Sequence, residues 1–333
     1  MMRIIPQSDV ERLLPVGPCV DVMAEAMRQV SARNVHLPIR QFMPVPGACG
    51  KMAIMPGALG TAGSDAQASF GIKLVCKYER PHGDPLGTHV GMVLLFDSAK
   101  GIPLAMLEGS SLTAVRTSAA SALATRELAR EDSTKLAILG NGEQAMRHVH
   151  AMRAVRPIER VTMWGRDPAR AADFAAAVTL ATGLPARAVG SVGEAVAGAD
   201  IICTTTSARE PILAGSALEP GQHINLVGSA IPTTSEVDDE AVARSRFYVD
   251  YREAAMAAAG ELLKAIASGA VTQAHIVGEI GEVVAGTVAA RRSPAEITMY
   301  KSLGVAAQDL AAAHAIWRSA EAQGAGIEVD LLA

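Results

Sequence analysis

Residues 135–145 read Lys135-Leu-Ala-Ile-Leu-Gly-Asn-Gly-Glu-Gln-Ala145. An apolar run ends abruptly at the glycines, and a segment compatible with a helix starts directly after them. This strand–turn–helix pattern is typical of a dinucleotide site. The first glycine permits a tight turn, the second lets a pyrophosphate approach the backbone, and the helix N-terminus favours the anion. The residues expected to line the pyrophosphate are Gly140, Asn141, Gly142, Gln144 and Ala145.

Further strand-like runs follow the glycine turn, at 161–164, 199–204, 223–227 and 247–250. Helix-compatible segments lie between several of them. Such alternation predicts an α/β fold with a doubly wound parallel sheet and right-handed crossovers. Thr205 and Thr206 follow the end of one run, so we expect them beside the nicotinamide ribose of a bound dinucleotide.

The second run leads into Met163-Trp-Gly-Arg-Asp-Pro168. Sites selective for NAD usually carry an acidic residue at this strand end, which binds the ribose 2′-hydroxyl. Here Gly165 leaves room for a 2′-phosphate and Arg166 can pair with it. Asp167 is the competing acidic residue, although Pro168 after it favours a helix N-cap. The sequence therefore predicts NADP(H) as the preferred cofactor, with NAD(H) possible.

The segment 37–107 has a different character. Short β-like runs at 52–55, 71–75 and 91–96 are separated by Pro/Gly turns, as in an antiparallel or mixed sheet. Two Ala-rich helices are expected, at about 112–129 and 305–323. At 333 residues the chain is long enough for two domains of ordinary size.

Composition excludes several classes of protein. Half of the 333 residues are hydrophobic, and the formal net charge is −4. This charge gives no global attraction to nucleic acid or to an anionic membrane, and no apolar run approaches the length of a membrane helix. The N-terminus lacks a secretion signal, and the four cysteines are isolated, as is typical of reduced thiols. We expect a cytoplasmic protein.

Three other segments stand out beside the glycine turn. They are Val115-Arg-Thr-Ser-Ala-Ala-Ser-Ala-Leu-Ala124, Gly278-Glu-Ile-Gly-Glu-Val-Val-Ala-Gly286 and Glu296-Ile-Thr-Met-Tyr-Lys-Ser-Leu-Gly304. Together with the glycine turn, they resemble blocks of the ornithine cyclodeaminase/μ-crystallin family, in the same order. The resemblance covers essentially the whole chain.

The resemblance implies a domain division and an assembly. Residues 1–118 and 306–333 would form a discontinuous α+β domain for substrate binding and dimerisation. Residues 119–305 would form a Rossmann domain that binds NAD(P). A homodimer is expected. Family members act on small α-amino or α-imino acids with a nicotinamide cofactor.

The resemblance also implies substrate residues. Arg40 and Arg116 match positions that hold the substrate carboxylate, for which a guanidinium fork is well suited. Lys73 matches the lysine that faces the reacting carbon, where an ammonium can donate a proton as charge changes. Two nearby arginines should depress its pKa. His89, near the same strand, is expected either to contact substrate or to be a structural histidine.

The three cations can also be interpreted as structural or surface residues. Arg116 can instead pair with a structural carboxylate, and Arg40 can lie at the surface. Lys73 stands between Ile72 and Leu74, so strand alternation puts it on the face opposite them. A solvated face is the default for such a lysine. On the cofactor side, the family blocks add four expected contacts, namely Thr117, Gly228, Lys301 and Ser302.

One position departs from the family pattern. True ornithine cyclodeaminases carry a catalytic aspartate where this chain reads Val227-Gly-Ser-Ala-Ile-Pro232, with Ala230 at the aspartate position. Alanine can neither accept a proton nor orient a water, whereas cyclodeamination needs acid–base work at several steps. The sequence therefore favours a reductase of a small α-imino acid, such as a Δ1-pyrroline-2-carboxylate-type ketimine, over cyclodeamination. Two further functions stay open, an amino-acid dehydrogenase and a non-catalytic NADP(H)-dependent binding protein like μ-crystallin.

Overall fold

The computed structural model describes the chain except for residues 48–49, 61–67, 81–83, 85, 88 and 332–333. The chain divides into two compact units, Met1–Arg116 with Val305–Ala333, and Thr117–Gly304. These borders lie within two residues of the domain division expected from the sequence.

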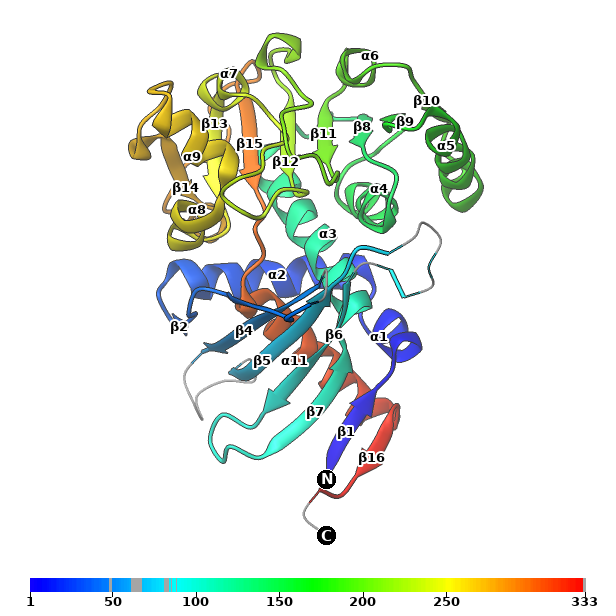
Figure 1. The fold of residues 1–333 in the computed structure, drawn as a ribbon, viewed down its shortest axis with the longest axis vertical. Helices are drawn as coiled ribbons and strands as arrows, with labels where there is room; N and C mark the ends of the chain where they lie inside the picture. The colour runs from blue at the N-terminus through cyan, green and yellow to red at the C-terminus, as the bar shows by residue number, and fades with distance from the viewer. Residues whose placement is uncertain (48–49, 61–67, 81–83, 85, 88, 332–333) are drawn as a thin grey trace. The chain divides into compact units, whose positions relative to one another are not determined.

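The second unit is built on an eight-stranded sheet in which every pairing is parallel (Figure 1). The order is β10-β9-β8-β11-β12-β15-β13-β14. This confirms the predicted doubly wound parallel sheet, with the last strand of the unit inserted between two earlier ones. The strands are β8 (Lys135–Leu139), β9 (Arg160–Trp164), β10 (Ala186–Ala188), β11 (Ile201–Thr204), β12 (His223–Leu226), β13 (Ser245–Val249), β14 (Ile276–Glu279) and β15 (Ile297–Lys301).

Side chains of the central strands are buried on both faces. Every residue of β11, β12 and β15 is buried, as expected of parallel strands covered on both sides. The helices and short 3-10 turns of this unit are α4 (Glu143–Val155), α5 (Pro168–Thr182), α6 (Val192–Val196), η1 (Gly215–Ala217), α7 (Asp239–Ala243), α8 (Arg252–Ala258), α9 (Gly260–Ala267), η2 (Gln273–His275) and α10 (Ile280–Val284).

The first unit has a mixed eight-stranded sheet, in which β1 and β7 pair in parallel and all other pairs are antiparallel. Its strands are β1 (Met2–Ile5), β2 (Val35–His36), β3 (Gln41–Pro44), β4 (Lys51–Leu59), β5 (Ser69–Lys77), β6 (His89–Phe96), β7 (Pro103–Glu108) and β16 (Ile327–Val329). Its helices are α1 (Gln7–Leu13), α2 (Val16–Ser31) and α11 (Ala306–Gln323).

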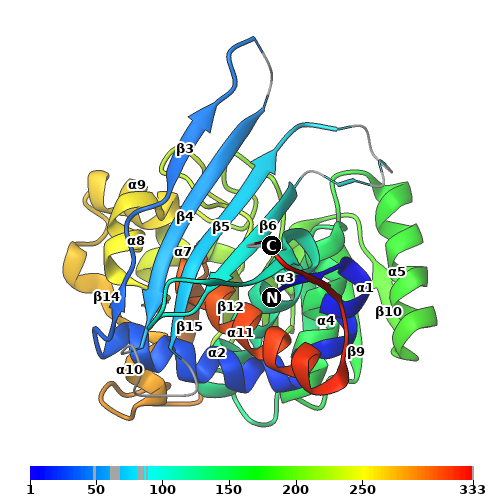
Figure 2. The same cartoon turned by 90° about the horizontal axis from the view of Figure 1, so that it is seen from below.

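One face of this mixed sheet is covered by helices of the same unit. Helix α11 packs against β4, β5 and β6, and α2 packs along α11 (Figure 2). The opposite face carries Phe70, Ile72, Leu74, Met92 and Leu94, which are exposed or only half-buried. A sheet face that is apolar and uncovered is a common feature of interaction surfaces.

Helix α3 (Gly109–Leu128) begins in the first unit and continues into the second. Its C-terminal carbonyls are held by arginines, because Arg156 donates to the carbonyls of Thr125, Arg126 and Ala129. Cations are favourable at this end of a helix. Within the described residues, no helix combines the length and apolar character that crossing a bilayer requires.

Candidate active site

The glycine turn lies at the switch point of the parallel sheet. Leu139, Trp164 and Thr204 are in register at the carboxyl ends of β8, β9 and β11. Gly140 follows with φ +122°, and a Cβ there would lie 2.8 Å from the carbonyl oxygen of Thr205. Only glycine fits this position without strain, so the predicted tight turn is present.

Helix α4 begins with an open N-terminus. Gly142 is its N-cap residue and provides no side-chain cap, so the first backbone N–H groups have no side-chain acceptor there. A Cβ on Gly142 would meet no atom within 4 Å, whereas Ala145 is fully buried. The side-chain oxygen of Gln144 is buried and, among the described residues, has no hydrogen-bond partner. These features fit a pyrophosphate held by backbone N–H groups.

A buried glutamate that the sequence analysis missed organises the neighbouring strand ends. Glu236 is fully buried and accepts hydrogen bonds from the Thr204 hydroxyl at 2.6 Å and the Gly228 N–H at 2.8 Å. It also accepts from the N–H and hydroxyl of Thr206, at 2.8 and 2.7 Å. Thr205 instead donates from its N–H and hydroxyl to the carbonyl of Leu139. The predicted cofactor residues Thr206 and Gly228 are therefore held by a carboxylate of the chain itself.

The end of β15 is deeply buried. Lys301 has no exposed surface, and its ammonium donates to the carbonyl of Ser229 at 2.6 Å and pairs with Glu261 at 3.0 Å. The ammonium of Lys301 thus has partners within the chain, and its expected contact with a cofactor stays a prediction. Ser302 is 3% exposed, and its hydroxyl has no hydrogen-bond partner among the described residues. Thr117 is also buried, in α3.

The end of β9 carries the residues expected to select the cofactor. Gly165 is buried, and a Cβ there would lie 3.2 Å from the Asn141 amide nitrogen. Arg166 is exposed. The Asp167 carboxylate caps α5 by accepting from the N–H groups of Ala169 and Arg170. The predicted capping role of Asp167 is confirmed.

In the first unit, Lys73 lies on the buried face of β5. Its cross-strand partners, Met55 on β4 and Val93 on β6, are buried as well, and Lys73 itself is 2% exposed. Its apolar neighbours Ile72 and Leu74 point to the uncovered face. The default of a solvated lysine on this strand is therefore wrong, because the sheet turns its charged residue inward and its apolar residues outward.

Lys73 and Arg116 converge on a single carboxylate of α11. Oδ1 of Asp309 accepts from Lys73 Nζ at 2.9 Å and from Arg116 Nε at 2.8 Å. Arg116 Nη1 donates to Gln308 Oε1 at 2.9 Å. The structural ion pair considered as the alternative for Arg116 is thus present. The bonds to Asp309 and Gln308 use Nε and Nη1 of Arg116, so Nη2 of Arg116 makes no hydrogen bond to either residue. Neither Asp309 nor Gln308 gave a signal in the sequence.

Arg40 and His89 complete this region. The charge of Arg40 contributes to lowering the pKa of Lys73, which puts Arg40 within electrostatic range of it. The three predicted cations are here termed the cation cluster (Arg40, Lys73 and Arg116). His89 is on the same face of the sheet as Lys73. Desolvation and the charges of Lys77 and Lys73 lower the pKa of His89 to about 4, although the residue as a whole is exposed. It is neutral at neutral pH.

Burial and neighbouring charges set the protonation of the cluster. Burial and the charges of Arg116 and Arg40 lower the pKa of Lys73 to about 8, against the opposing effect of Asp309. Burial alone would raise the pKa of Asp309, but the charges of Arg116 and Lys73 outweigh it and hold this pKa below its usual range. Two cations, Lys73 and Arg116, thus contact one carboxylate of the chain, and the charge of Arg40 acts on Lys73. Guanidinium and ammonium groups of this kind suit an anionic ligand.

Comparison with known proteins gives the family. Residues 2–324 match the model of the ornithine cyclodeaminase/mu-crystallin family. The chain belongs to this family. A Δ1-pyrroline-2-carboxylate reductase of Bacillus cereus is 34% identical over 332 residues, covering 99% of this chain and 100% of the relative. The ketimine reductase mu-crystallin of Rattus norvegicus is 39% identical over 286 residues, covering 86% of each chain.

A solved structure of the same family shares the whole fold. The Δ1-pyrroline-2-carboxylate reductase of Thermococcus litoralis, in complex with NADH and L-proline, has a TM-score of 0.93 and 32% sequence identity. The match covers 98% of this chain and 100% of that one.

The structure also describes Ala230, the position at which this chain departs from true cyclodeaminases. Ala230 is half-buried, and the hydroxyl of its neighbour Ser229 is held by the carbonyl and hydroxyl of Thr234, at 2.9 and 2.7 Å. Ser229 is therefore not directed as a substitute for the missing carboxylate. Glu236 lies further along the same segment, but its oxygens are already engaged by four donors.

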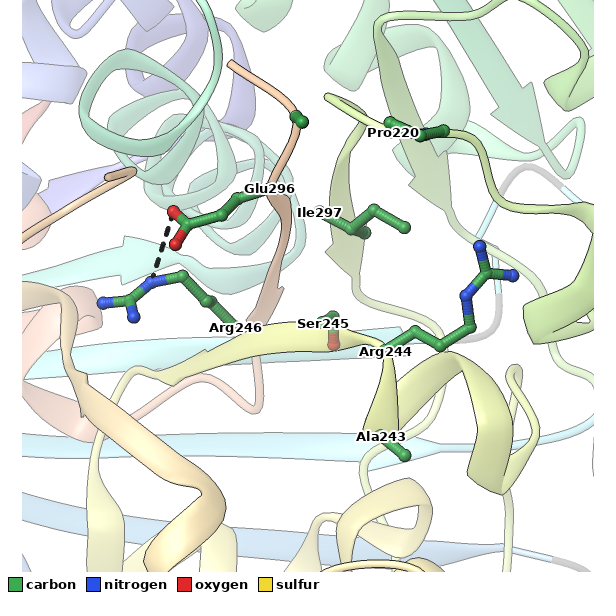
Figure 3. Close-up of a pocket in the computed structure, with 8 residues that line it drawn as sticks. Pro220, Ala243, Arg244, Ser245, Arg246, Glu296 and Ile297 are labelled. Atoms are coloured by element: carbon green, nitrogen blue, oxygen red, sulfur yellow. Dashed lines mark ion pairs between the residues drawn. The ribbon is translucent and has the colours of Figure 1, made fainter. Parts of the chain in front are cut away.

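A pocket of about 460 Å³ lies elsewhere on the parallel sheet, at the amino ends of β13 and β15 (Figure 3). Its arginines are occupied by the chain. Arg246 pairs with Glu296 and bonds the Tyr248 hydroxyl, and Arg244 donates to the carbonyls of Gly215 and Leu218. Because dinucleotides bind at the carboxyl ends of such strands, this pocket is not the cofactor site.

Proposed function

We infer that the protein reduces a small cyclic α-imino acid of the Δ1-pyrroline-2-carboxylate type to the corresponding amino acid. The observation that carries this proposal is the buried contact of Lys73 and Arg116 with Asp309, in a chain whose relatives include a Δ1-pyrroline-2-carboxylate reductase and a ketimine reductase. A nicotinamide dinucleotide, when bound, supplies the hydride that becomes the new C–H bond.

Arg40 and Arg116 are proposed to hold the substrate carboxylate. Asp309 and Gln308 already fix two nitrogens of Arg116, so the guanidinium plane is set before substrate arrives. The remaining Nη2 is available for a charge-assisted hydrogen bond. Preorganised donors of this kind orient a substrate at little entropic cost.

Lys73 is proposed to protonate the imine nitrogen. Reduction of a C=N bond adds a hydride to carbon and a proton to nitrogen, and the ammonium of Lys73 can supply that proton and recover it from water. A pKa of about 8 leaves Lys73 mostly protonated at neutral pH while making the proton easier to release than from an ordinary lysine.

Cyclodeamination of ornithine is not proposed. That reaction needs a further acid–base group on the cofactor side, where this chain has Ala230 and where Ser229 is engaged by Thr234. Imine reduction needs only a carboxylate clamp, one proton donor and a positioned cofactor.

NADPH is proposed as the preferred cofactor. Gly165 and the exposed Arg166 at the end of β9 suit a 2′-phosphate, and Asp167 is occupied as a helix cap. The Thermococcus litoralis relative was solved with NADH, so the preference is a property to be tested on this chain.

A homodimer is proposed through the uncovered face of the mixed sheet. Phe70, Ile72, Leu74, Met92 and Leu94 form a continuous cross-strand surface, since Ile72 pairs with Leu94 and Leu74 with Met92. Burying such a face against a second copy would be favourable at about 25 cal/mol per Å² of apolar surface.

A direct assay tests the proposal. The purified protein is mixed with NADPH or NADH and a panel of five- and six-membered cyclic imino acids, and cofactor absorbance at the nicotinamide band is followed. We expect oxidation of NADPH with a cyclic imino acid, and loss of turnover with retained cofactor binding in Lys73→Met. An absence of oxidation across the panel would reject the function. Unchanged behaviour of Lys73→Met would favour a binding protein.

A further inference from the structure

Asp309 has no part in the proposed chemistry, yet its carboxylate contacts two members of the cation cluster, Lys73 and Arg116. Its side chain is fully buried, in the first turn of α11. A carboxylate in such surroundings is costly unless it is paired and hydrogen-bonded. Here both requirements are met by residues that we propose act on substrate, which suggests a role beyond packing.

The contact geometry makes one oxygen a shared anchor. Lys73 Nζ and Arg116 Nε both donate to Oδ1, at 2.9 and 2.8 Å. Without this atom, two buried positive charges would repel each other at close range. The preceding residue of the same helix, Gln308, accepts from Arg116 Nη1 and donates to Met27 on α2. Helix α11 therefore holds Arg116 through two consecutive side chains, and Lys73 through one.

The charged groups that face Lys73 come from several elements. Asp309 on α11 is the anion nearest to it, and Arg116 on α3 and Arg40 before β3 are the cations that act on it. Along the sheet, Lys77 on β5 and His89 on β6 share its face. Cys19 on α2 faces Arg116, and burial raises the pKa of its thiol to about 12, so it stays neutral. Among these groups Asp309 alone favours the ammonium form.

We propose that Asp309 is a positioning residue, whose carboxylate fixes Arg116 for the substrate carboxylate and keeps Lys73 in the ammonium form that protonates the imine. The proposal rests on the proposed function for its chemical meaning. The charge effect on Lys73, however, is a property of the substrate-free protein and can be measured without turnover.

The first measurement is a titration of Lys73 by NMR. The chain has seven lysines, so protein labelled with ¹³C at the lysine ε-carbon gives a tractable spectrum, and the Lys73 signal is assigned by its loss in Lys73→Met. We expect Asp309→Asn to move the Lys73 midpoint to lower pH by about one unit or more, since an opposite charge in contact shifts a pKa by roughly that amount. An unmoved midpoint would overturn the proposal.

Two further variants separate charge from placement. Asp309→Glu keeps the charge but displaces it, so the Lys73 midpoint should stay near that of the wild type while kcat falls at least tenfold. Gln308→Leu removes a neutral partner of Arg116, and it should raise KM without moving the midpoint. Circular dichroism shows whether Asp309→Asn folds. If it does not, Asp309→Glu tests the proposal instead, and a kcat equal to that of the wild type in Asp309→Glu would contradict the positioning role.

The outcomes for the two proposals can be told apart. A wild type that reduces no imino acid, together with a shifted Lys73 midpoint in Asp309→Asn, rejects the function and keeps the electrostatic role of Asp309. An active wild type, together with an unshifted Lys73 midpoint in Asp309→Asn, keeps the function and rejects the electrostatic role of Asp309.

Discussion

Lys73 on β5 and Asp309 on α11 lie 236 positions apart in the chain and form a buried ion pair of 2.9 Å, with side chains only 3% and 0% exposed. Burying two charges costs desolvation energy that their attraction does not reliably repay. Such a pair is therefore weak evidence of a contribution to stability. It is better explained by the proposed role of Lys73, which needs a cation held on the buried face of the sheet.

The pH dependence of kcat/KM should carry the signature of Lys73. This parameter reports ionisations of the free enzyme. The pKa of Lys73 is lowered to about 8, so the ammonium form is present below that pH and lost above it. We expect kcat/KM to fall as pH rises through about 8, and His89, with a pKa of about 4, to add no inflection near pH 6 or 7. A rise in kcat/KM through pH 8 would show that the amine is the active form.

Two glycines of the turn should respond differently to alanine. A Cβ at Gly142 meets no protein atom within 4 Å, so Gly142→Ala should fold with an unchanged melting temperature and lose cofactor affinity at least tenfold through contact with the pyrophosphate. Gly140→Ala places a Cβ 2.8 Å from the Thr205 carbonyl at a φ of +122°, so it should also lower stability. Isothermal titration and thermal melts measure both effects. Wild-type cofactor affinity in Gly142→Ala would place the pyrophosphate elsewhere.

Cofactor preference should depend on Arg166. Arg166→Ala removes a proposed charged hydrogen bond, for which a loss of roughly tenfold to hundredfold in the NADPH to NADH ratio of kcat/KM is reasonable. Asp167→Asn is the matched control, because asparagine also caps helices. It should leave the KM for NADH within twofold. A large increase in that KM would assign Asp167 to the ribose hydroxyls instead.

The uncovered face of the mixed sheet should be required for dimerisation. Phe70 is 44% exposed, and its ring lies tilted against that of Phe96, with the ring centroids 5.9 Å apart. Phe70→Asp therefore places a charge within the proposed interface. We expect sedimentation velocity to show a dimer for the wild type and monomer for Phe70→Asp. Leu180→Asp, at a leucine 90% exposed on α5, is the control and should remain dimeric. A wild type that sediments as a monomer at micromolar concentration would contradict the assembly.

The parallel sheet and its glycine turn were predictable because their signals are local. An apolar run, two glycines and a helix start lie within 11 residues, 135–145, and the capping role of Asp167 follows from Pro168. The place of β15 between β12 and β13 was not predictable. Its residues are buried on both faces, and a run of that kind carries no information about its neighbours.

The partners of the site residues were less predictable, since they depend on tertiary contacts. Asp309 stands in an Ala-rich helix, where an acidic residue usually faces solvent, and only folding brings it to Lys73. The alternation of Ile72, Lys73 and Leu74 correctly predicted that Lys73 lies on the face opposite its neighbours. The default expectation that this face is solvated was wrong, because Lys73 is buried. One sequence alone does not show which face of a strand is covered by helices, so the burial of Lys73 and the partial exposure of Ile72 and Leu74 could not be predicted. Glu236 and Glu261 were missed for the same reason, because each binds partners distant in sequence.

The proposed reaction transfers a hydride to the α-carbon of an imino acid held by the cation cluster. Turnover with NADPH dideuterated at C4 of the nicotinamide ring, with Δ1-pyrroline-2-carboxylate as substrate and mass spectrometry of the product, follows that hydride. We expect proline that carries one deuterium, at the α-carbon. The absence of proline, or proline without deuterium, would contradict it.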